Sequence, residues 1–171
     1  ITLNTNKDEI AVCNLGSINL VQHVQGGVLD REKLARTVKT AVRMLDNVID
    51  INYYAVPQAR TSNLKHRPVN RGIRGFQDAL YEMNLACGSD AAVEFADESM
   101  EVISYYAIST SSDLAVERGT YETFKGSLWD QGILPIDSLD LVAKSRPERM
   151  FEVDRTQRLD WDTLRNKVQK D

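Results

Sequence analysis

Cys13 is the side chain best suited to chemistry in this sequence, and it lies in the string AVCNLGSINL at positions 11–20. The apolar run from Ile10 to Cys13 predicts a strand, and the small and polar residues that begin at Asn14 predict a turn after it. Side chains at the ends of strands in α/β folds often face a ligand crevice. On the residues alone the thiol is only a candidate, since a lone cysteine after an apolar run is more often a small core residue.

Cys87 is the second thiol, between a predicted helix end and a helix cap at Ser89. We interpret it as structural or incidental, because a buried cysteine usually acts as a small hydrophobe. A disulfide with Cys13 would need Cα atoms within about 7 Å, and the sequence gives no argument for that closeness. Two cysteines form neither a secreted disulfide framework nor a zinc cluster.

Neither histidine is in a pattern typical of a metal site. His66 stands between Lys65 and Arg67 and before a proline, which favours a hydrogen-bonded turn, and His23 stands alone. A metal site needs about three or four converging ligands. Four carboxylates have helical spacing, but the Glu-x-x-His motif of di-iron bundles is missing, so we interpret them as a solvated face. They are Glu94, Asp97, Glu98 and Glu101.

The composition is that of one ordinary domain. The chain has 171 residues, 42% of them hydrophobic and 27% charged, with a net charge of −4. No basic patch indicates a nucleic-acid partner, no apolar run is long enough for a membrane span, and the first residues do not resemble a signal peptide. We therefore predict a cytoplasmic protein that binds neither membrane nor nucleic acid.

The spacing predicts a helix-dominated α/β fold. A hairpin is expected between residues 1–3 and 10–13, a strand at 69–75, short helices near 57–64 and 76–83, and loops with short turns over 120–160. Three caps are expected to open helices: Asp30, Ser89 or Asp90, and Asp160. The helix after Asp30 carries a spaced apolar set, and the longest helix should end at Gly119. That apolar set is Leu34, Val38, Ala41, Leu45, Val48 and Ile49.

The string that carries Cys13 resembles the segment of one redox-active cysteine in the large subunit of ribonucleotide reductase. Further blocks are similar to successive segments of class I large subunits, in the same order: residues 50–57 (DINYYAVP), 62–68 (SNLKHRP), 72–80 (GIRGFQDAL) and 132–135 (GILP). The HRP block favours class I over the cobalamin-dependent class. Arg71 and Arg74 depart from the pattern, since many relatives carry uncharged residues there, which leaves the two faces of that strand undecided.

The resemblance implies a ten-stranded α/β barrel with the active site inside it. This chain would supply one or two strands and several outer helices, as part of a single catalytic barrel domain over residues 1–171. The chain lacks an initiating Met and ends in a predicted helix without a stop signal, so we interpret it as a central piece cut at both ends.

The implied reaction is reduction of a ribonucleoside diphosphate to its deoxy form by thiyl-radical chemistry. In that family one cysteine carries the radical and two others supply electrons and end as a disulfide. Cys13 matches one member of that redox-active pair, and the resemblance places its partner and the radical cysteine outside this chain. Residues 1–171 alone are therefore expected to be inactive.

The same resemblance implies the partners of the intact enzyme. A metal-containing small subunit would supply the radical in class I, with cobalamin as the alternative, and thioredoxin or glutaredoxin would be the reductant. The large subunit would form a homodimer, and no cofactor or metal is expected within this chain. Two other readings stay open on the residues: a helical interaction or regulatory module without chemistry, and a stand-alone thiol enzyme with Cys13 as nucleophile.

Overall fold

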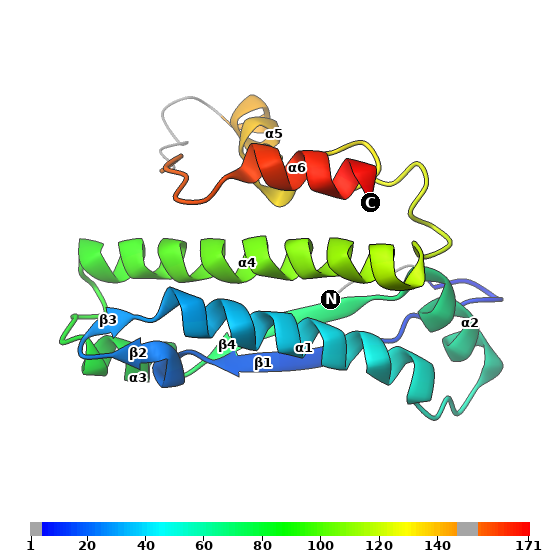
Figure 1. The fold of residues 1–171 in the computed structure, drawn as a ribbon, viewed down its shortest axis with the longest axis horizontal. Helices are drawn as coiled ribbons and strands as arrows, with labels where there is room; N and C mark the ends of the chain where they lie inside the picture. The colour runs from blue at the N-terminus through cyan, green and yellow to red at the C-terminus, as the bar shows by residue number, and fades with distance from the viewer. Residues whose placement is uncertain (1–4, 147–153) are drawn as a thin grey trace.

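The computed structural model describes residues 5–146 and 154–171. Within these ranges the protein is a helix-dominated α/β structure, as the sequence predicts (Figure 1). The elements are β1 (Asn14–Asn19), η1 (Leu20–His23), β2 (Val24–Gln25), β3 (Val28–Leu29), α1 (Arg31–Ile51), α2 (Pro57–His66), β4 (Val69–Arg74), α3 (Phe76–Glu82), α4 (Asp90–Arg118), η2 (Pro135–Asp137), α5 (Ser138–Ser145) and α6 (Trp161–Lys170).

The strands β1 and β4 form a parallel pair, and the chain reaches β4 from β1 through α1 and α2. The register runs from Asn14 opposite Val69 to Asn19 opposite Arg74. A parallel pair needs a crossover of this kind, because a tight hairpin can join only antiparallel strands. In the described part of the chain each of these strands pairs only with the other, so both have an edge without a strand partner.

Helix α1 packs on the β1–β4 pair, and a glycine sets the approach to β1. A Cβ at Gly16 would lie 3.3 Å from Cδ1 of Leu45, closer than side chains normally pack. The N-cap is Asp30, as predicted, and its side chain accepts a hydrogen bond of 2.8 Å from the Lys33 amide. The buried stripe differs from the predicted set, because Val42 is buried while Val48 is 37% exposed.

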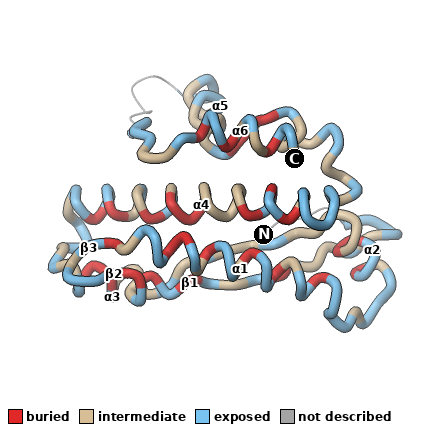
Figure 2. The backbone as a smooth tube through the Cα atoms, viewed as in Figure 1, coloured by how far each residue is buried: buried red, intermediate tan, exposed pale blue. Residues whose placement is uncertain are grey.

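Helix α4 is the central layer of the molecule. Figure 1 shows α1 and the sheet on one side of it and α6 on the other, and α4 contacts both helices. Figure 2 shows buried positions recurring along α1, α4 and α6. One hydrophobic cluster joins η1, α1, α3 and α4, and a second gathers Leu134, Trp161, Leu164 and Val168 against the opposite side of α4.

The ends of α4 and α6 are where the sequence predicts them. Ser89 caps α4 by accepting a hydrogen bond of 3.2 Å from the Ala92 amide, and the helix ends at Gly119, whose φ is +85°. Asp160 caps α6 through the Thr163 amide at 2.9 Å. These caps are local signals, and the structure uses all of them.

Two expectations about secondary structure, for residues 120–160 and for residues 1–3, are not confirmed. Residues 120–160 were predicted to form loops with short turns, which is wrong for η2 and α5, since residues 135–145 are helical. The predicted hairpin partner at residues 1–3 lies outside the described residues. In the described part of the chain, no helix combines the length and the hydropathy needed to cross a membrane.

Candidate active site around Cys13

Cys13 lies immediately before the amino end of β1, whereas the sequence predicts it at the carboxyl end of a strand. The prediction is wrong because residues 10–13 are irregular and Asn14–Asn19, interpreted as a turn, form the strand. Strand preference depends strongly on the neighbouring strand, and pairing with β4 overrides the low preference of Asn and Gly. Cys13 is exposed and not in a disulfide.

Asn14 fixes the chain directly after the thiol. Its side chain is buried and donates hydrogen bonds to the Asn63 side chain at 3.1 Å and to the Pro68 carbonyl at 3.0 Å. Asn63, which is fully buried on α2, in turn donates to the Tyr54 hydroxyl at 2.7 Å. Buried polar groups need such partners, because leaving one without a hydrogen bond costs about 1–3 kcal/mol.

Glu9 fixes the chain four residues before the thiol. Its carboxylate lies 2.5 Å from Nζ of Lys65 and 2.7 Å from Nε2 of His66, both in the last turn of α2. Hydrogen bonds, the one from His66 having the larger effect and the one from Lys65 the smaller, hold the pKa of the Glu9 carboxyl below its usual value. The two attachments place Cys13 on a four-residue stretch between Glu9 and Asn14, backed by one helix.

The sheet next to Cys13 has one covered and one open face. Alternation along β1 buries Asn14 and Ile18 on the side of α1 and leaves three residues of the other face exposed. These are Leu15, Ser17 and Asn19. On β4 the residues opposite Ser17 and Asn19 are Gly72 and Arg74, and both are exposed. The open face therefore carries polar residues and a glycine apart from Leu15, which is 67% exposed.

Cys87 lies in the turn between α3 and α4 and is exposed. Its exposure does not fit the interpretation of Cys87 as a small hydrophobe in the core, and the alternative interpretation, an incidental cysteine, stays a prediction. Asn84 takes the left-handed conformation at φ +54°, which turns the chain out of α3 and carries Cys87 away from the packed side of the helices. The structure has no disulfide between Cys87 and Cys13, since both thiols are free.

Both histidines are occupied by hydrogen bonds. His23 is buried, with Nδ1 3.0 Å from the Asn19 carbonyl and Nε2 2.8 Å from the Thr37 hydroxyl. His66 bridges Glu9 and Thr123, with Nδ1 2.9 Å from the Thr123 hydroxyl, so its interpretation as a hydrogen-bonded residue is confirmed. Over residues 5–146 and 154–171 no group of three or more His, Cys, Asp or Glu side chains is placed to hold a metal.

The four spaced carboxylates of α4 are not simply a solvated face, and that interpretation is wrong. Glu101 is only 8% exposed, and its Oε1 accepts hydrogen bonds from the amides of Arg158 and Leu159 and from Nε1 of Trp161, at 2.8–3.0 Å. Asp97 pairs with the Arg158 guanidinium at 2.6 Å. These carboxylates fasten the chain that leads into α6, a role that sequence spacing alone does not reveal.

The complete chain matches one family model, described as the barrel domain of ribonucleotide reductase, over residues 1–171. The chain belongs to the ribonucleotide reductase barrel-domain family. The expected family and the helix-dominated α/β fold class are thereby confirmed.

The curated relatives are much longer than this chain. The ribonucleoside-diphosphate reductase subunit alpha of Chlamydia trachomatis serovar D is 54% identical over 99% of the chain and 16% of the relative, and that of Chlamydia pneumoniae is 52% identical over the same shares. The ribonucleoside-diphosphate reductase large chain of Schizosaccharomyces pombe is 37% identical over 97% of the chain and 19% of the relative. The chain therefore spans about a sixth to a fifth of the relatives it matches.

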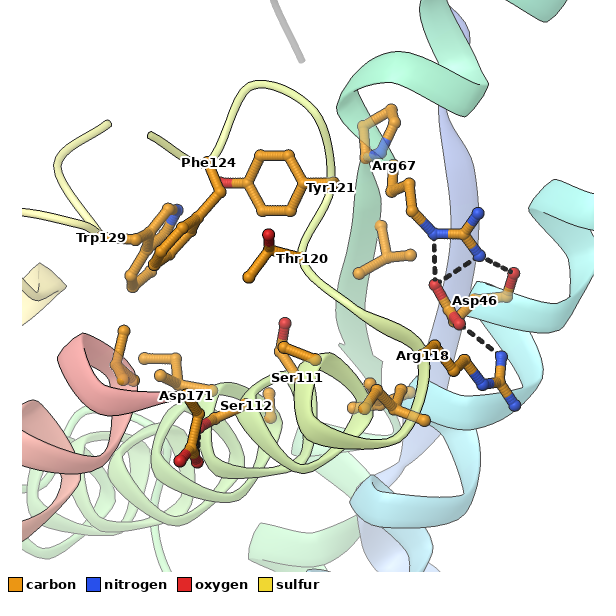
Figure 3. A pocket seen from close by; sticks show the side chains of 18 of the residues that line it. Asp46, Arg67, Ser111, Ser112, Arg118, Thr120, Tyr121, Phe124, Trp129 and Asp171 are labelled. Atoms are coloured by element: carbon orange, nitrogen blue, oxygen red, sulfur yellow. Dashed lines mark hydrogen bonds and ion pairs between the residues drawn. The ribbon is translucent and has the colours of Figure 1, made fainter. Parts of the chain in front are cut away.

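A cavity of about 390 Å³ in this reductase barrel segment lies between β4, the C-terminal half of α4 and the loop after it (Figure 3). On one side Arg67 binds Asp46 of α1 at 2.7 Å, and Asp46 also binds Arg118 at 2.5 Å. Figure 3 shows the aromatic rings of Tyr121, Phe124 and Trp129 on the other side. The ion pairs join the ends of α1, α2 and α4, and so they support the helix that backs Cys13.

Arg71 settles the faces of β4 that the sequence left undecided. Its side chain lies on the covered side, where Nη1 is 3.5 Å from the Val38 carbonyl of α1, and it borders the cavity. Burial lowers the pKa of its guanidinium to about 10. Arg74 is exposed on the open face, so the two arginines of this reductase strand lie on opposite sides of the sheet.

The residues around Cys13 that sequence reasoning missed are Glu9, Tyr54, Asn63 and Asp46. Two of the decisive contacts are distant in the sequence: Glu9 and His66 are 57 positions apart, and Asn14 and Asn63 are 49. A polar pair carries no periodic signal, so nothing in the local pattern could identify them. A weak signal was available for Asn63, which lies in the block 62–68 that resembles the reductases.

Proposed function

We propose that this chain is part of the catalytic barrel domain of a class I ribonucleoside-diphosphate reductase large subunit, with Cys13 as one cysteine of its redox-active pair. Two findings support the proposal: family membership over residues 1–171, and the enzyme name of the relatives. The observation that carries the role of Cys13 is its setting, an exposed thiol between two attachments to α2, beside a polar open sheet face. A barrel places such an open face toward its interior, since the helices cover the outside.

The redox step transfers two electrons from two thiols to the ribose of a ribonucleoside diphosphate. The bond between the 2′ carbon and its hydroxyl breaks, the hydroxyl leaves as water with one proton, and the carbon gains a hydrogen. Two S–H bonds break and one S–S bond of about 2.05 Å forms, so electrons and atoms balance. Cys13 supplies one of the two sulfurs, and the second cysteine of the pair belongs to another part of the large subunit.

The attachments of Cys13 suit this role because disulfide formation needs two Cβ atoms about 3.5–4.5 Å apart. Asn14 and Glu9 limit the range of the thiol on either side. Thioredoxin or glutaredoxin would reduce the disulfide after each turnover by thiol–disulfide exchange, which requires an accessible sulfur. Cys13 is exposed, as this exchange demands.

The radical would come from a metal-containing small subunit and not from this chain. The described residues do not fit a metal, because no three or more potential ligands converge among them. We therefore assign no step of the reaction to a metal here. The large subunit would act as a homodimer together with the small subunit.

The test replaces Cys13 by Ser in the complete reductase subunit. A hydroxyl keeps the approximate size of the thiol but cannot form a disulfide. We expect nucleotide binding to survive and multiple-turnover reduction with a thioredoxin-type donor to be lost. Sustained turnover of Cys13→Ser would refute the assignment, and loss of turnover in the Cys87→Ser control would transfer the role to the other thiol.

A further inference from the structure

Glu9 ion-pairs with the end of α2 and so attaches the stretch that leads to Cys13 to that helix. We infer that Glu9, held by Lys65 and His66, is a positioning residue that fixes the Cys13 thiol for redox chemistry. The inference deepens the proposed function and rests on it. Glu9 does not touch the reacting atoms; it acts through the backbone of residues 10–12.

The Glu9 carboxylate is held at both oxygens. Oε1 lies 2.5 Å from Nζ of Lys65 and Oε2 lies 2.7 Å from Nε2 of His66, and the Glu9 side chain is only 13% exposed. Two separate donors fix the orientation of the carboxylate as well as its position, and charge-assisted hydrogen bonds are stronger than neutral ones. Because the Glu9 side chain is largely covered, water screens this pair less than it screens a fully exposed ion pair.

The His66 ring is itself held from the loop after α4. Nδ1 lies 2.9 Å from the Thr123 hydroxyl, on the opposite side of the ring from Glu9. With a proton on Nε2, the ring donates to Glu9 and accepts from Thr123, and both contacts are satisfied at once. The Thr123 contact therefore sets the ring plane that Glu9 meets.

Backbone hydrogen bonds continue the attachment toward the thiol. The Asn6 side chain accepts from the amides of Asp8 and Glu9 at 2.8 and 2.9 Å, which shapes the turn that presents Glu9. The Ile10 amide donates to the Gln58 carbonyl at the start of α2 at 3.3 Å. The stretch before Cys13 is thus attached near both ends of one helix.

The length of the stretch explains why this attachment affects the thiol. Each residue of an extended chain spans at most about 3.6 Å, so a short stretch anchored at one end by Asn14 alone could still move its thiol by several ångströms. The Glu9 ion pairs, together with the hydrogen bond of 3.3 Å from the Ile10 amide to the Gln58 carbonyl, limit that freedom from the other end. Misplacing a reacting group by about 1 Å can cost on the order of a hundredfold in rate.

The test uses Glu9→Ala and Glu9→Gln in the complete reductase subunit, with Asp8→Ala as the control. Asp8 is the exposed neighbour of Glu9, with a side chain 72% exposed. Two quantities are measured: the iodoacetamide alkylation rate of each cysteine, resolved by peptide mass spectrometry, and the kcat and KM of reduction. Cys87 is the internal reference, since it is exposed in a different turn.

We expect Glu9→Ala to raise the alkylation rate of Cys13 about threefold relative to that of Cys87, because the stretch before Cys13 opens locally. We expect kcat to fall about tenfold while the nucleotide KM stays within about twofold, since positioning is lost and binding is not. Glu9→Gln keeps the shape and should lie between wild type and Glu9→Ala. Asp8→Ala should match the wild type in both measurements.

Two outcomes would overturn the positioning role. One is wild-type kcat and wild-type Cys13 alkylation in Glu9→Ala. The other is an equal change at Cys13 and Cys87 in both Glu9 variants, which would indicate a general loss of structure. Failure of the proposed function is distinguishable, because it would appear as sustained turnover in Cys13→Ser whatever the Glu9 variants do.

Discussion

The two cysteines of this chain are both exposed, but their surroundings are built in different ways. The stretch around Cys13 is held by contacts between residues about 50 positions apart, through Asn63 and His66. The turn around Cys87 is held by short-range backbone contacts, such as the Leu85 amide to the Leu80 carbonyl at 2.8 Å and the Ser89 amide to the Ala86 carbonyl at 3.0 Å. Exposure therefore does not separate the two thiols, whereas the range of the contacts does.

The regions around Cys13 and Cys87 also differ in how much free energy a side-chain change should cost. The Cys13 region contains a buried polar network, whose members cost free energy whenever one partner is removed. The Cys87 turn depends on backbone geometry and on one helix cap, so side-chain changes there should have small and local effects. The predictions below compare the two regions by changing one at a time.

The largest stability effect is expected at Asn63. Its side chain is fully buried and connects Asn14 to Tyr54. Asn63→Ala leaves both partners short of a hydrogen bond, so the free energy of unfolding should fall by about 3 kcal/mol, and the alkylation rate of Cys13 should rise. Urea unfolding of the chain and peptide-resolved alkylation measure the two effects.

Arg60→Ala is the matched control for Asn63→Ala, because Arg60 is an exposed residue of the same helix. It should change the free energy of unfolding by no more than about 0.5 kcal/mol. If Asn63→Ala is equally mild, the polar network does not hold the Cys13 region, and the contrast with Cys87 disappears.

Acid should weaken the Cys13 region through Glu9. Hydrogen bonds from His66 and Lys65 lower the folded-state pKa of Glu9 from 4.5, so its pairing stabilises the folded state fully above that value. The stabilisation is lost as the pH falls through the lowered pKa. Urea midpoints at pH 3–6 should therefore show a gap between wild type and Glu9→Gln that shrinks toward low pH; a constant gap would contradict the pairing.

A smaller effect is expected from the helix cap beside Cys87. Ser89→Ala removes the hydrogen bond to the Ala92 amide at the start of α4 and should lower the free energy of unfolding by about 1 kcal/mol. The alkylation rate of Cys13 should not change, because its attachments lie on α2. A change at Cys13 similar to that of Asn63→Ala would show that the two regions are coupled.

The smallest effect is expected from Cys87 itself. Because the residue is exposed, Cys87→Ser should change the free energy of unfolding by no more than about 0.5 kcal/mol. Turnover of the complete reductase subunit should stay at the wild-type level. A clear fall in the free energy of unfolding would contradict the prediction, because it would mean that the Cys87 side chain contributes to packing although it is exposed.

Much of the fold could be predicted because helix ends are encoded locally. Asp30, Ser89 and Asp160 each accept a hydrogen bond from an amide three residues later, and a sequence window of four residues contains that information. Gly119 similarly ends α4 through its own backbone freedom. The sequence also predicts the strand at Val69–Arg74, because Pro68 and Gly75 interrupt regular structure on either side of it.

The parts that could not be predicted depend on partners elsewhere in the chain. Asn14–Asn19 has the composition of a turn and becomes a strand only because β4 lies beside it. Glu101 has the spacing of a surface carboxylate, and its side chain is covered only because residues 158–161 fold back onto α4. Helix α5 lies in a stretch whose glycines and prolines indicated loops.

The sequence by itself determined the family, the helix-dominated class and most helix boundaries, because these follow from local motifs and spacing. It also singled out Cys13 through the string around it. Only the tertiary structure decided that the thiol precedes its strand, that Asn14 and Glu9 attach it to α2, and that Arg71 is covered while Arg74 is open. The physical reason is distance along the chain: these contacts join residues 33 to 57 positions apart, and a local pattern cannot encode which distant polar group will meet which.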